Sequence, residues 1–429
     1  MNRILLVILI IFVSFSQTLV AQPGTLTEAA PEAGGFSGKR LSLLDSGMSS
    51  WVQKNWVNGS VALIARKGKI VFYKSYGYNN PDTKEALNKT GIFRIASQTK
   101  AITTVAAMIL WEEGKFSLDD PVSKFIPAFA NQTVLNTFHL KDTTYTTVPA
   151  NRPVTIRDLL THTSGLGYPG IGTAEANAMY AKKQITGGTG TKEERSLAQA
   201  MDVLGGTPLL FQPGTKWMYG LSTDLLGYLI EVWSGMTLEE YFAKRIFQPL
   251  GMEDTYFNVP ASKASRVVNF FQQDSTGVTK KEDKVWGGTL DLSYPTQQKK
   301  YFSGGGGLSS TIYDYAVFLQ MLLNQGAYGN TRILSHNTVR MMTMNQIGDL
   351  FVNGSENKFG FGFSIITDNG SRLGPSQAGT YAWGGVFSTS YWVDPKENMF
   401  AIIYRQMWGP HVTDTDRAFK PLVYQAIND

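Results

Sequence analysis

The sequence predicts a mixed α/β fold of the α+β kind, in which helices flank an antiparallel sheet and a helical region is inserted between its strands. Three observations support this fold class: a hairpin pattern near the N-terminus, a succession of helix patterns through the middle, and a β-rich final third. Because strand patterns lie at both ends of the chain, we expect the two ends to meet in one sheet.

The expected strands are short runs rich in β-branched and aromatic residues, bounded by turn residues. Residues 60–66 and 70–73 form a hairpin pattern around Lys67-Gly68-Lys69. In the final third, the turn signal Asp-Pro-Lys-Glu-Asn at residues 394–398 separates two further strands. The C-terminal strands are expected at residues 359–365, 386–393 and 399–405.

The expected helices show apolar periodicity or a capping signal at their N-termini. A helix is expected to begin at Ser97 and to end near Gly114. Capping-box patterns predict helix starts at Thr155 and Thr237. Residues 174–206 are rich in Gly, Thr and Lys, and we expect them to form a mobile excursion over one face. The stripe that the first of these helices buries is expected at Ala101, Ile102, Val105, Ala106 and Ile109. Further helices are expected at residues 41–56, 312–323 and 416–427.

Composition bounds the class of protein. The 429 residues are 43% apolar and 17% charged, which is ordinary for a globular protein with a large core. The 39 basic and 34 acidic residues are scattered, so the net charge of +5 indicates a solvated surface and no nucleic-acid partner. No obligate protein partner is evident. The absence of cysteine excludes disulfides and a cysteine nucleophile.

The first 21 residues predict a secretory signal peptide. Asn2-Arg3 precede an apolar run at residues 4–13, and Ala21 offers a small residue for cleavage. The run is shorter than the ~20 residues of a spanning helix, so no stable membrane anchor is expected. An exported bacterial protein, periplasmic or secreted, is the simplest interpretation. A flexible leader at residues 22–40 and one catalytic domain at 41–429 are expected to follow. Within that domain the α/β part is expected at about 41–96 and 285–429, and the helical part at about 97–260.

One short motif carries most of the chemical information. In Phe-Arg-Ile-Ala-Ser-Gln-Thr-Lys (residues 93–100), Ser97 precedes Lys100 by three positions at the start of an apolar helix. One helical turn separates the two side chains, so they share a face. A serine hydroxyl is a poor nucleophile until a neighbouring base removes its proton, and a desolvated lysine amine can be that base.

Taken with four other segments, this motif resembles the serine β-lactamase and penicillin-binding protein superfamily, and most of all its branch of family VIII carboxylesterases and class C β-lactamases. The resemblance covers residues 41 to the C-terminus and implies a serine β-lactamase-like fold with an inserted all-helical subdomain. One Ser-x-x-Lys alone is weak, but five ordered segments are specific. The other four segments are residues 155–166, 212–227, 249–252 and 383–386.

The resemblance implies three catalytic residues: Ser97 as the nucleophile, Lys100 as its activating partner, and Tyr219 as a proton shuttle. The family's second motif is Tyr-x-Asn, and here Leu221 holds the asparagine position. Loss of that amide removes a hydrogen bond to the acylamino group of a β-lactam or peptide, and such polar sites discriminate strongly. This departure favours ester substrates.

The family's third motif, Lys-Thr-Gly, reads Trp383-Gly384-Gly385 here, so the cation that would bind a substrate carboxylate is absent. The glycines allow a substrate to lie against the strand. The resemblance implies that the backbone N–H groups of Ser97 and Val386 form the oxyanion hole. No metal and no cofactor are expected.

Motifs of other catalytic and ligand-binding classes are absent or incomplete in the sequence. No serine lies in a Gly-x-Ser-x-Gly pattern, His162 is interpreted as structural, and Gly304–Gly307 is interpreted as a flexible turn. Three functions remain open: an exported esterase with weak β-lactamase activity, a β-lactamase or D-peptidase acting on peptidoglycan-type amides, and an acyltransferase or non-catalytic penicillin-recognising domain. Five tryptophans are candidates for an acyl pocket as well as for core packing: Trp217, Trp286, Trp383, Trp392 and Trp408.

Overall fold

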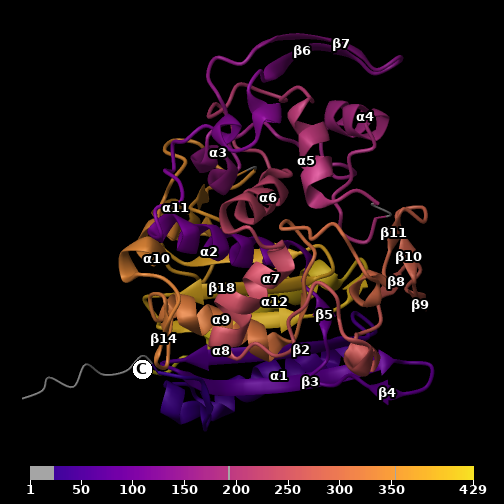
Figure 1. Cartoon of the computed structure of the whole chain (residues 1–429). Helices are drawn as coiled ribbons and strands as arrows, with labels where there is room; N and C mark the ends of the chain where they lie inside the picture. Colours follow the sequence, from indigo (N-terminus) through magenta and orange to yellow (C-terminus); the bar gives the residue numbers. More distant parts are fainter. Residues whose placement is uncertain (1–23, 192–193, 353) are drawn as a thin grey trace, which may run out of the picture.

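The computed structural model describes residues 24–191, 194–352 and 354–429, so the expected signal peptide lies outside the described residues. Within this described part, one nine-stranded sheet has the order β1-β3-β2-β19-β18-β17-β16-β15, with β4 paired to β3. Strands from the two ends of the chain lie side by side in it (Figure 1). The sheet strands are β1 (Thr27–Glu28), β2 (Gly59–Arg66), β3 (Lys69–Asn80), β4 (Glu85–Ala86), β15 (Lys358–Phe359), β16 (Ser364–Ile365), β17 (Tyr381–Gly385), β18 (Thr389–Asp394) and β19 (Met399–Tyr404).

The predicted antiparallel sheet is confirmed, with one parallel pair at its edge. Strands β2 and β19 pair antiparallel from Val61↔Tyr404 to Arg66↔Met399, which joins the two ends of the chain. The segment expected as a flexible leader instead forms β1, which pairs parallel with β3, and the 3₁₀ turn η1 (Pro31–Gly34). Residues 27–34 are therefore built into the fold.

Helices cover both faces of the sheet. Side chains alternate along a strand, so Ala62 and Ile64 of β2 pack under α1 and α12, while Leu63 faces the main core with α2 and α9. Strand β19 alternates in the same way, with Ile403 on the first face and Ile402 on the second. The helices are α1 (Gly38–Gln53), α2 (Thr99–Glu112), α3 (Ile156–Thr161), α4 (Ala174–Lys182), α5 (Leu197–Gly205), α6 (Ser222–Ser234), α7 (Leu238–Phe242), α8 (Gln248–Leu250), α9 (Ile312–Leu323), α10 (His336–Met342), α11 (Asp368–Ser371) and α12 (Val412–Tyr424).

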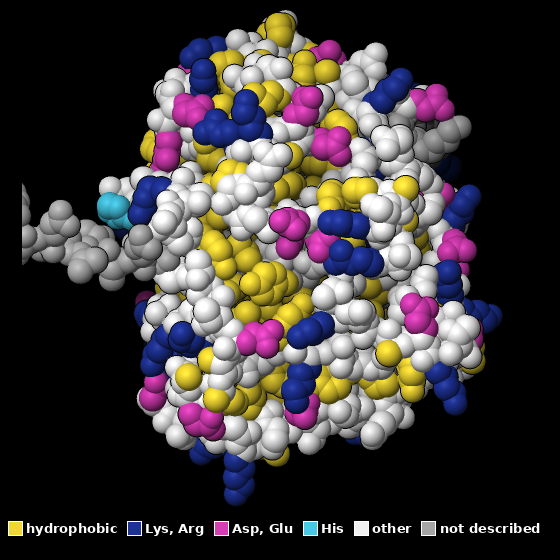
Figure 2. Space-filling model, turned by 60° about the horizontal axis from the view of Figure 1, so that its bottom comes forward, with side chains coloured by type: hydrophobic (Ala, Val, Ile, Leu, Met, Phe, Trp, Pro, Cys, Tyr) yellow, Lys and Arg dark blue, Asp and Glu magenta, His cyan; other side chains and the backbone are white. Residues whose placement is uncertain are grey.

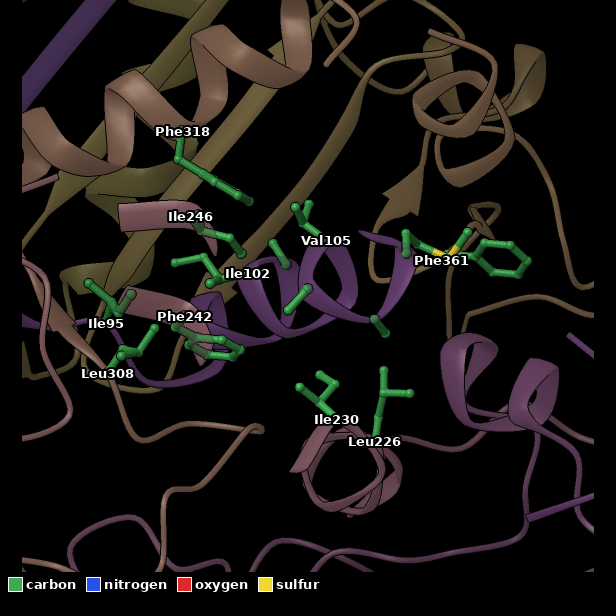
Figure 3. Packing of buried hydrophobic residues seen from close by; sticks show 14 of the residues in the cluster. Ile95, Ile102, Val105, Leu226, Ile230, Phe242, Ile246, Leu308, Phe318 and Phe361 are labelled. Carbon is green, nitrogen blue, oxygen red and sulfur yellow. The ribbon is translucent and has the colours of Figure 1, made fainter. Parts of the chain in front are cut away.

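Helix α2 is the centre of the main core. Every residue of α2 from Thr99 to Leu110 is buried, so the helix is enclosed on all sides and has no single apolar stripe. Figure 3 shows Ile102 and Val105 of α2 among side chains from α6, such as Leu226, and from α9, such as Phe318. This enclosure fixes the end of α2 from which the Ser-x-x-Lys motif emerges.

Local signals in the sequence located several elements well. The helix expected at 312–323 has those bounds as α9, and both expected capping boxes are formed, by Thr155 with Asp158 and by Thr237 with Glu240. The hairpin turn expected between β2 and β3 is also present. Beyond α7 the helix passes through a π-helical turn, η5 (Ala243–Phe247), into α8 and ends at Gly251.

Three further parts of the fold differ from the expectation. Within the segment expected to be weakly patterned, residues 174–182 and 197–205 are helical as α4 and α5, because Thr173 and Ser196 cap helices whose apolar sides are buried. The strand expected at 359–365 is two short strands, β15 and β16, because Gly362 turns the chain with φ of 82°. The inserted region is not all helical, since β6 (Thr133–His139) and β7 (Thr144–Pro149) form a projecting hairpin (Figure 1).

The remaining short strands form small satellite sheets around the main one. Their pairings are antiparallel except between β20 and β8. They are β5 (Phe93–Arg94) with β12 (Ser309–Ser310), β8 (Phe271–Gln273) with β9 (Thr279–Lys281) and β20 (Met407–Trp408), β10 (Lys284–Val285) with β11 (Leu290–Asp291), and β13 (Ala327–Tyr328) with β14 (Thr331–Arg332). The β5–β12 pair leads directly into the nucleophile turn.

On the face turned forward in Figure 2, basic and acidic side chains are interspersed and neither kind gathers into a patch. A surface of this kind is typical of a solvated protein, in agreement with the scattered charges of the sequence. Among the helices of the described ranges, none combines the length and apolar character needed to cross a bilayer.

Candidate active site

Ser97 lies in a tight turn between β5 and α2. The 3₁₀ turn η2 (Ala96–Gln98) places it there, and Ala96 has φ of 44°, in the left-handed region that non-glycine residues rarely adopt. From residue 91 to residue 110, Ser97 is the single residue that is not buried. Backbone strain beside one accessible hydroxyl, in a segment that is otherwise core, is typical of a functional position.

The Lys100 side chain lies next to Ser97, as expected for two residues that are one helical turn apart. Its side chain is 2% exposed, and its Nζ lies 3.5 Å from Ser97 Oγ. The same Nζ donates a 2.6 Å hydrogen bond to the carbonyl oxygen of Gly305. It also lies over the Tyr219 ring, 4.5 Å from the centroid. These contacts hold the buried amine between the Gly305 carbonyl oxygen and the Ser97 hydroxyl.

Tyr219 comes from a segment 122 residues away and completes the group. Its phenol donates a 2.5 Å hydrogen bond to Ser97 Oγ. Its ring stacks on Tyr168 with centroids 5.5 Å apart, and it contacts Trp383 at 5.6 Å and His162 at 5.2 Å. The hydroxyl, the amine and the phenol therefore meet in one place, which is the arrangement that an acyl-serine mechanism needs.

The turn at Gly304–Gly307, interpreted from sequence as flexible, is buried and closely packed under Lys100. A Cβ on Gly305 would collide with the Asp224 carboxylate, so glycine is required for this close approach. Asp224 accepts hydrogen bonds from Ser303 Oγ (2.6 Å) and from Gly305 N (3.2 Å). Burial raises the pKa of the Asp224 carboxyl, and the nearby Lys100 charge opposes that rise. Asp224 thus holds the turn whose carbonyl binds Lys100.

Trp383, Gly384 and Gly385 form the end of β17 beside the nucleophile turn. A Cβ on Gly385 would collide with the carbonyl oxygen of Ile95, so glycine is needed where β17 meets this turn. Residue 386, expected at the start of a strand, instead lies in the turn between β17 and β18. Val386 and Ser97 line the same two cavities.

The turn that contains Val386 is held from both sides. Ser388 N donates to Gly385 O at 3.0 Å, and the indole N–H of Trp408 donates to Val386 O at 2.6 Å. Trp408 is itself stacked on Trp286, with ring centroids 5.5 Å apart. These contacts hold the peptide group that carries the Val386 N–H and the peptide group that follows it. That N–H is the expected second donor of the oxyanion hole.

His162 is a structural residue, as interpreted from sequence. It ends α3 in the left-handed conformation and is buried against the rings of Trp217, Tyr219 and Phe359. Burial, with a smaller contribution from the Lys100 charge, lowers the pKa of His162 to about 3. The imidazole is therefore neutral at physiological pH and supports the Tyr219 ring by packing.

Leu221 does not lie where the sequence placed it. The expectation put it at the substrate, but its side chain is fully buried in the main core and is not among the residues that line either cavity at Ser97. The reason is local: Leu221 N donates to Gly167 O at 3.0 Å, which turns the side chain inward at the start of α6. The position still supplies no amide to the site.

Two cavities meet at Ser97. An open groove of about 1200 Å³ runs along β17 toward α12, with Tyr219 and Trp383 in its wall. A smaller cavity of about 210 Å³ lies on the other side, lined by Tyr168, Ile185 and others. In the described ranges, His, Asp and Glu side chains form no group of three or more that could hold a metal ion.

Sequence reasoning missed Tyr168 and Asp224, and it named Trp408 only as a candidate for an acyl pocket or for core packing. Folding, and not a short sequence motif, brings each of these side chains to the motif residues. A spacing signal existed for Asp224, which follows Tyr219 by five residues at the start of a helix, but nothing local marked its carboxylate as buried.

Fold and site together define a class: a hydrolase of the serine β-lactamase fold. A family model described as Beta-lactamase matches residues 44–424. The chain therefore belongs to the beta-lactamase family, as its motifs predicted.

Known relatives cover most of the chain. Esterase EstB of Burkholderia gladioli is 28% identical over 406 residues, which span 90% of this chain and 97% of that protein. An Escherichia coli K12 protein provisionally named a D-alanyl-D-alanine carboxypeptidase is 28% identical, over 99% of this chain and 95% of its own. Among solved structures, EstCE1, a hydrolase with promiscuous acyltransferase activity, has a TM-score of 0.76 at 26% identity, covering 91% of this chain and 99% of its own.

Proposed function

We propose that this protein is a serine carboxylesterase that cleaves small to medium neutral esters through an acyl-Ser97 intermediate. The observation that carries the proposal is the contact of three groups: Ser97 Oγ lies 2.5 Å from the Tyr219 phenol and 3.5 Å from Lys100 Nζ. The similarity to Esterase EstB and to EstCE1 supports the same class of reaction.

In the acylation step, Ser97 Oγ attacks the ester carbonyl carbon. Its proton passes to the Lys100 and Tyr219 pair, which is within hydrogen-bonding distance. The developing oxyanion is stabilised by the backbone N–H groups of Ser97 and Val386. The tetrahedral intermediate then expels the alcohol, which receives the proton from Tyr219, and the acyl group stays on Ser97.

In the deacylation step, a water molecule takes the place of the alcohol. Tyr219 and Lys100 remove its proton, and the water oxygen attacks the acyl carbon. Collapse of the second tetrahedral intermediate returns the proton to Ser97 Oγ and releases the carboxylic acid. Removing one oxyanion donor typically costs about 3–4 kcal/mol, so the position of the Val386 peptide is a large part of catalysis.

The site favours neutral esters over β-lactams and peptides for two reasons. Trp383 stands where the related lactamases have a lysine that binds a substrate carboxylate, and its ring packs against Tyr219. Position 221 supplies no amide that could bind an acylamino group, because its leucine side chain is buried in the main core away from the site. A carboxylate substrate would therefore meet aromatic surface instead of a cation.

The test compares substrate classes on one enzyme preparation. We expect kcat/KM for p-nitrophenyl butyrate to exceed that for a cephalosporin and for an acyl-D-alanyl-D-alanine peptide by at least ~10²-fold, and Ser97→Ala to abolish all three activities. A preference for the peptide would instead support the D-peptidase function suggested by the E. coli relative. Unchanged ester turnover in Ser97→Ala would refute the proposed mechanism.

A further inference from the structure

If the proposed function holds, the two cavities at Ser97 bind different halves of the ester, one the acyl group and the other the alcohol. Their linings indicate which cavity binds which half. Ser97, Ile171 and Val386 line both cavities, so the reacting carbonyl lies where the cavities meet. Tyr219 lines only the open groove. The group that receives a proton from Tyr219 is the departing alcohol oxygen, so the alcohol must leave on the Tyr219 side.

The smaller cavity is built to hold an apolar group of limited size. Ile185, Leu290 and Phe387 line it and are buried, whereas Ile171 and Trp286 are exposed and form its rim. Among the residues that the structure describes, its lining carries no charged side chain. An apolar pocket of about 150 Å³ can hold benzene, so the 210 Å³ here corresponds to an acyl group of about eight carbons.

The groove is different in size and character. It is several times larger, and its lining includes polar and charged side chains of α12 such as Asp416, Arg417 and Lys420. Leu373 on its wall is 79% exposed. A groove of this volume places no tight limit on the shape of the group that occupies it.

We propose that the small cavity binds the acyl group and the groove binds the alcohol. Substrates are then esters of short apolar acids, up to about eight carbons, with alcohols of bulky and varied shape. The enzyme then selects esters by the length of their acyl chain, and the buried side chains of Ile185 and Leu290 set the limit of that length.

A pair of isomeric esters tests this assignment directly. Decyl butanoate and butyl decanoate have the same atoms and similar polarity, but only the first has an acyl group that fits the cavity. We expect decyl butanoate to be hydrolysed at least ~10-fold faster in kcat/KM, measured by titration of the released acid. Equal rates, or faster hydrolysis of butyl decanoate, would overturn the assignment.

Variants of the cavity wall give a second readout. Leu290→Ala should raise the rate for butyl decanoate relative to decyl butanoate by at least ~5-fold, since it lengthens the cavity. The matched control in the groove, Leu373→Ala, should leave the ratio within about 2-fold. If Leu290→Ala folds poorly in a thermal melt, Leu290→Val tests the same wall with less loss of packing. An unchanged ratio in the Leu290 variants would contradict the proposal.

The two proposals fail in different ways. If neither ester is hydrolysed and Ser97 is never acylated, the esterase function itself is wrong. If both esters are hydrolysed in a Ser97-dependent way at equal rates, the esterase function stands and the assignment of the cavities is wrong.

Discussion

Replacing Tyr219 with phenylalanine removes one atom from the centre of the site and little else. The phenyl ring keeps its stack on Tyr168 at 5.5 Å and its contacts with Trp217, His162 and Trp383. What is lost is the 2.5 Å hydrogen bond to Ser97 Oγ. A single hydrogen bond contributes about 1 kcal/mol to stability, so the variant should fold and melt within a few degrees of the parent.

The loss of activity should be far larger than the loss of stability. Positioned proton transfer contributes about 10²–10⁴-fold to the rate, so Tyr219→Phe should lower kcat/KM by about 10³-fold. That factor corresponds to about 4 kcal/mol of transition-state stabilisation. Most of it should be in kcat, because the aromatic wall that contacts the substrate is unchanged.

The choice of substrate separates the two roles proposed for Tyr219. The p-nitrophenolate ion leaves readily without a proton, whereas ethoxide needs one. If Tyr219 protonates the leaving group, the variant should lose at least ~10-fold more activity on ethyl butyrate than on p-nitrophenyl butyrate. Equal losses would limit Tyr219 to activating Ser97. A loss below ~10-fold on both esters would refute the proton relay.

Three further predictions follow from the same geometry. Lys100→Met keeps the buried aliphatic part of the side chain but removes Nζ, and it should lower kcat/KM by about 10³-fold. In a double-mutant cycle with Tyr219→Phe the combined loss should be less than additive, and fully additive losses would show separate proton paths. Trp408→Phe removes the N–H that binds Val386 O, and should lower kcat by roughly 3–10-fold while KM stays within about 2-fold; a change confined to KM would contradict an effect on the oxyanion hole. His162 has its pKa lowered to about 3 by burial, so the stability it contributes is fully present above its unfolded pKa of about 6.5 and is lost as the pH falls toward 3. Unfolding free energy should drop by about 2 kcal/mol between pH 7 and pH 5 from this group, and His162→Phe should flatten that slope in urea titrations whereas His336→Asn, on the surface, should not.

The sequence predicted those parts of the fold that local signals determine. The capping boxes at Thr155 and Thr237 need only four residues each to be recognised, and both are formed. A similar box at Ser196 with Gln199 begins α5, but the surrounding Gly and Thr residues obscured it. The break of the expected strand at Gly362 depends on tertiary contact, because its left-handed backbone packs against Thr104 of α2.

In the candidate site, as in the fold, the sequence predicted what neighbouring residues determine and missed what contacts between distant segments determine. Ser97 and Lys100 are adjacent on one helical turn, so spacing alone brought them together. Tyr219 was placed by resemblance, since 122 residues separate it from Ser97. The position of Leu221 could not be deduced, because a backbone hydrogen bond to Gly167 decides which way its side chain points. Contacts between distant segments carry information that no short motif contains.

The central claim is that Ser97 carries the acyl group during turnover. Rapid acid quench of the enzyme with p-nitrophenyl butyrate, followed by intact-mass measurement and peptide mapping, tests it most directly. The account predicts one added butyryl group on the peptide that contains Ser97, with more of it accumulating in any variant that slows deacylation. An acyl group found on another residue, or burst release of p-nitrophenol without any acylated protein, would contradict it.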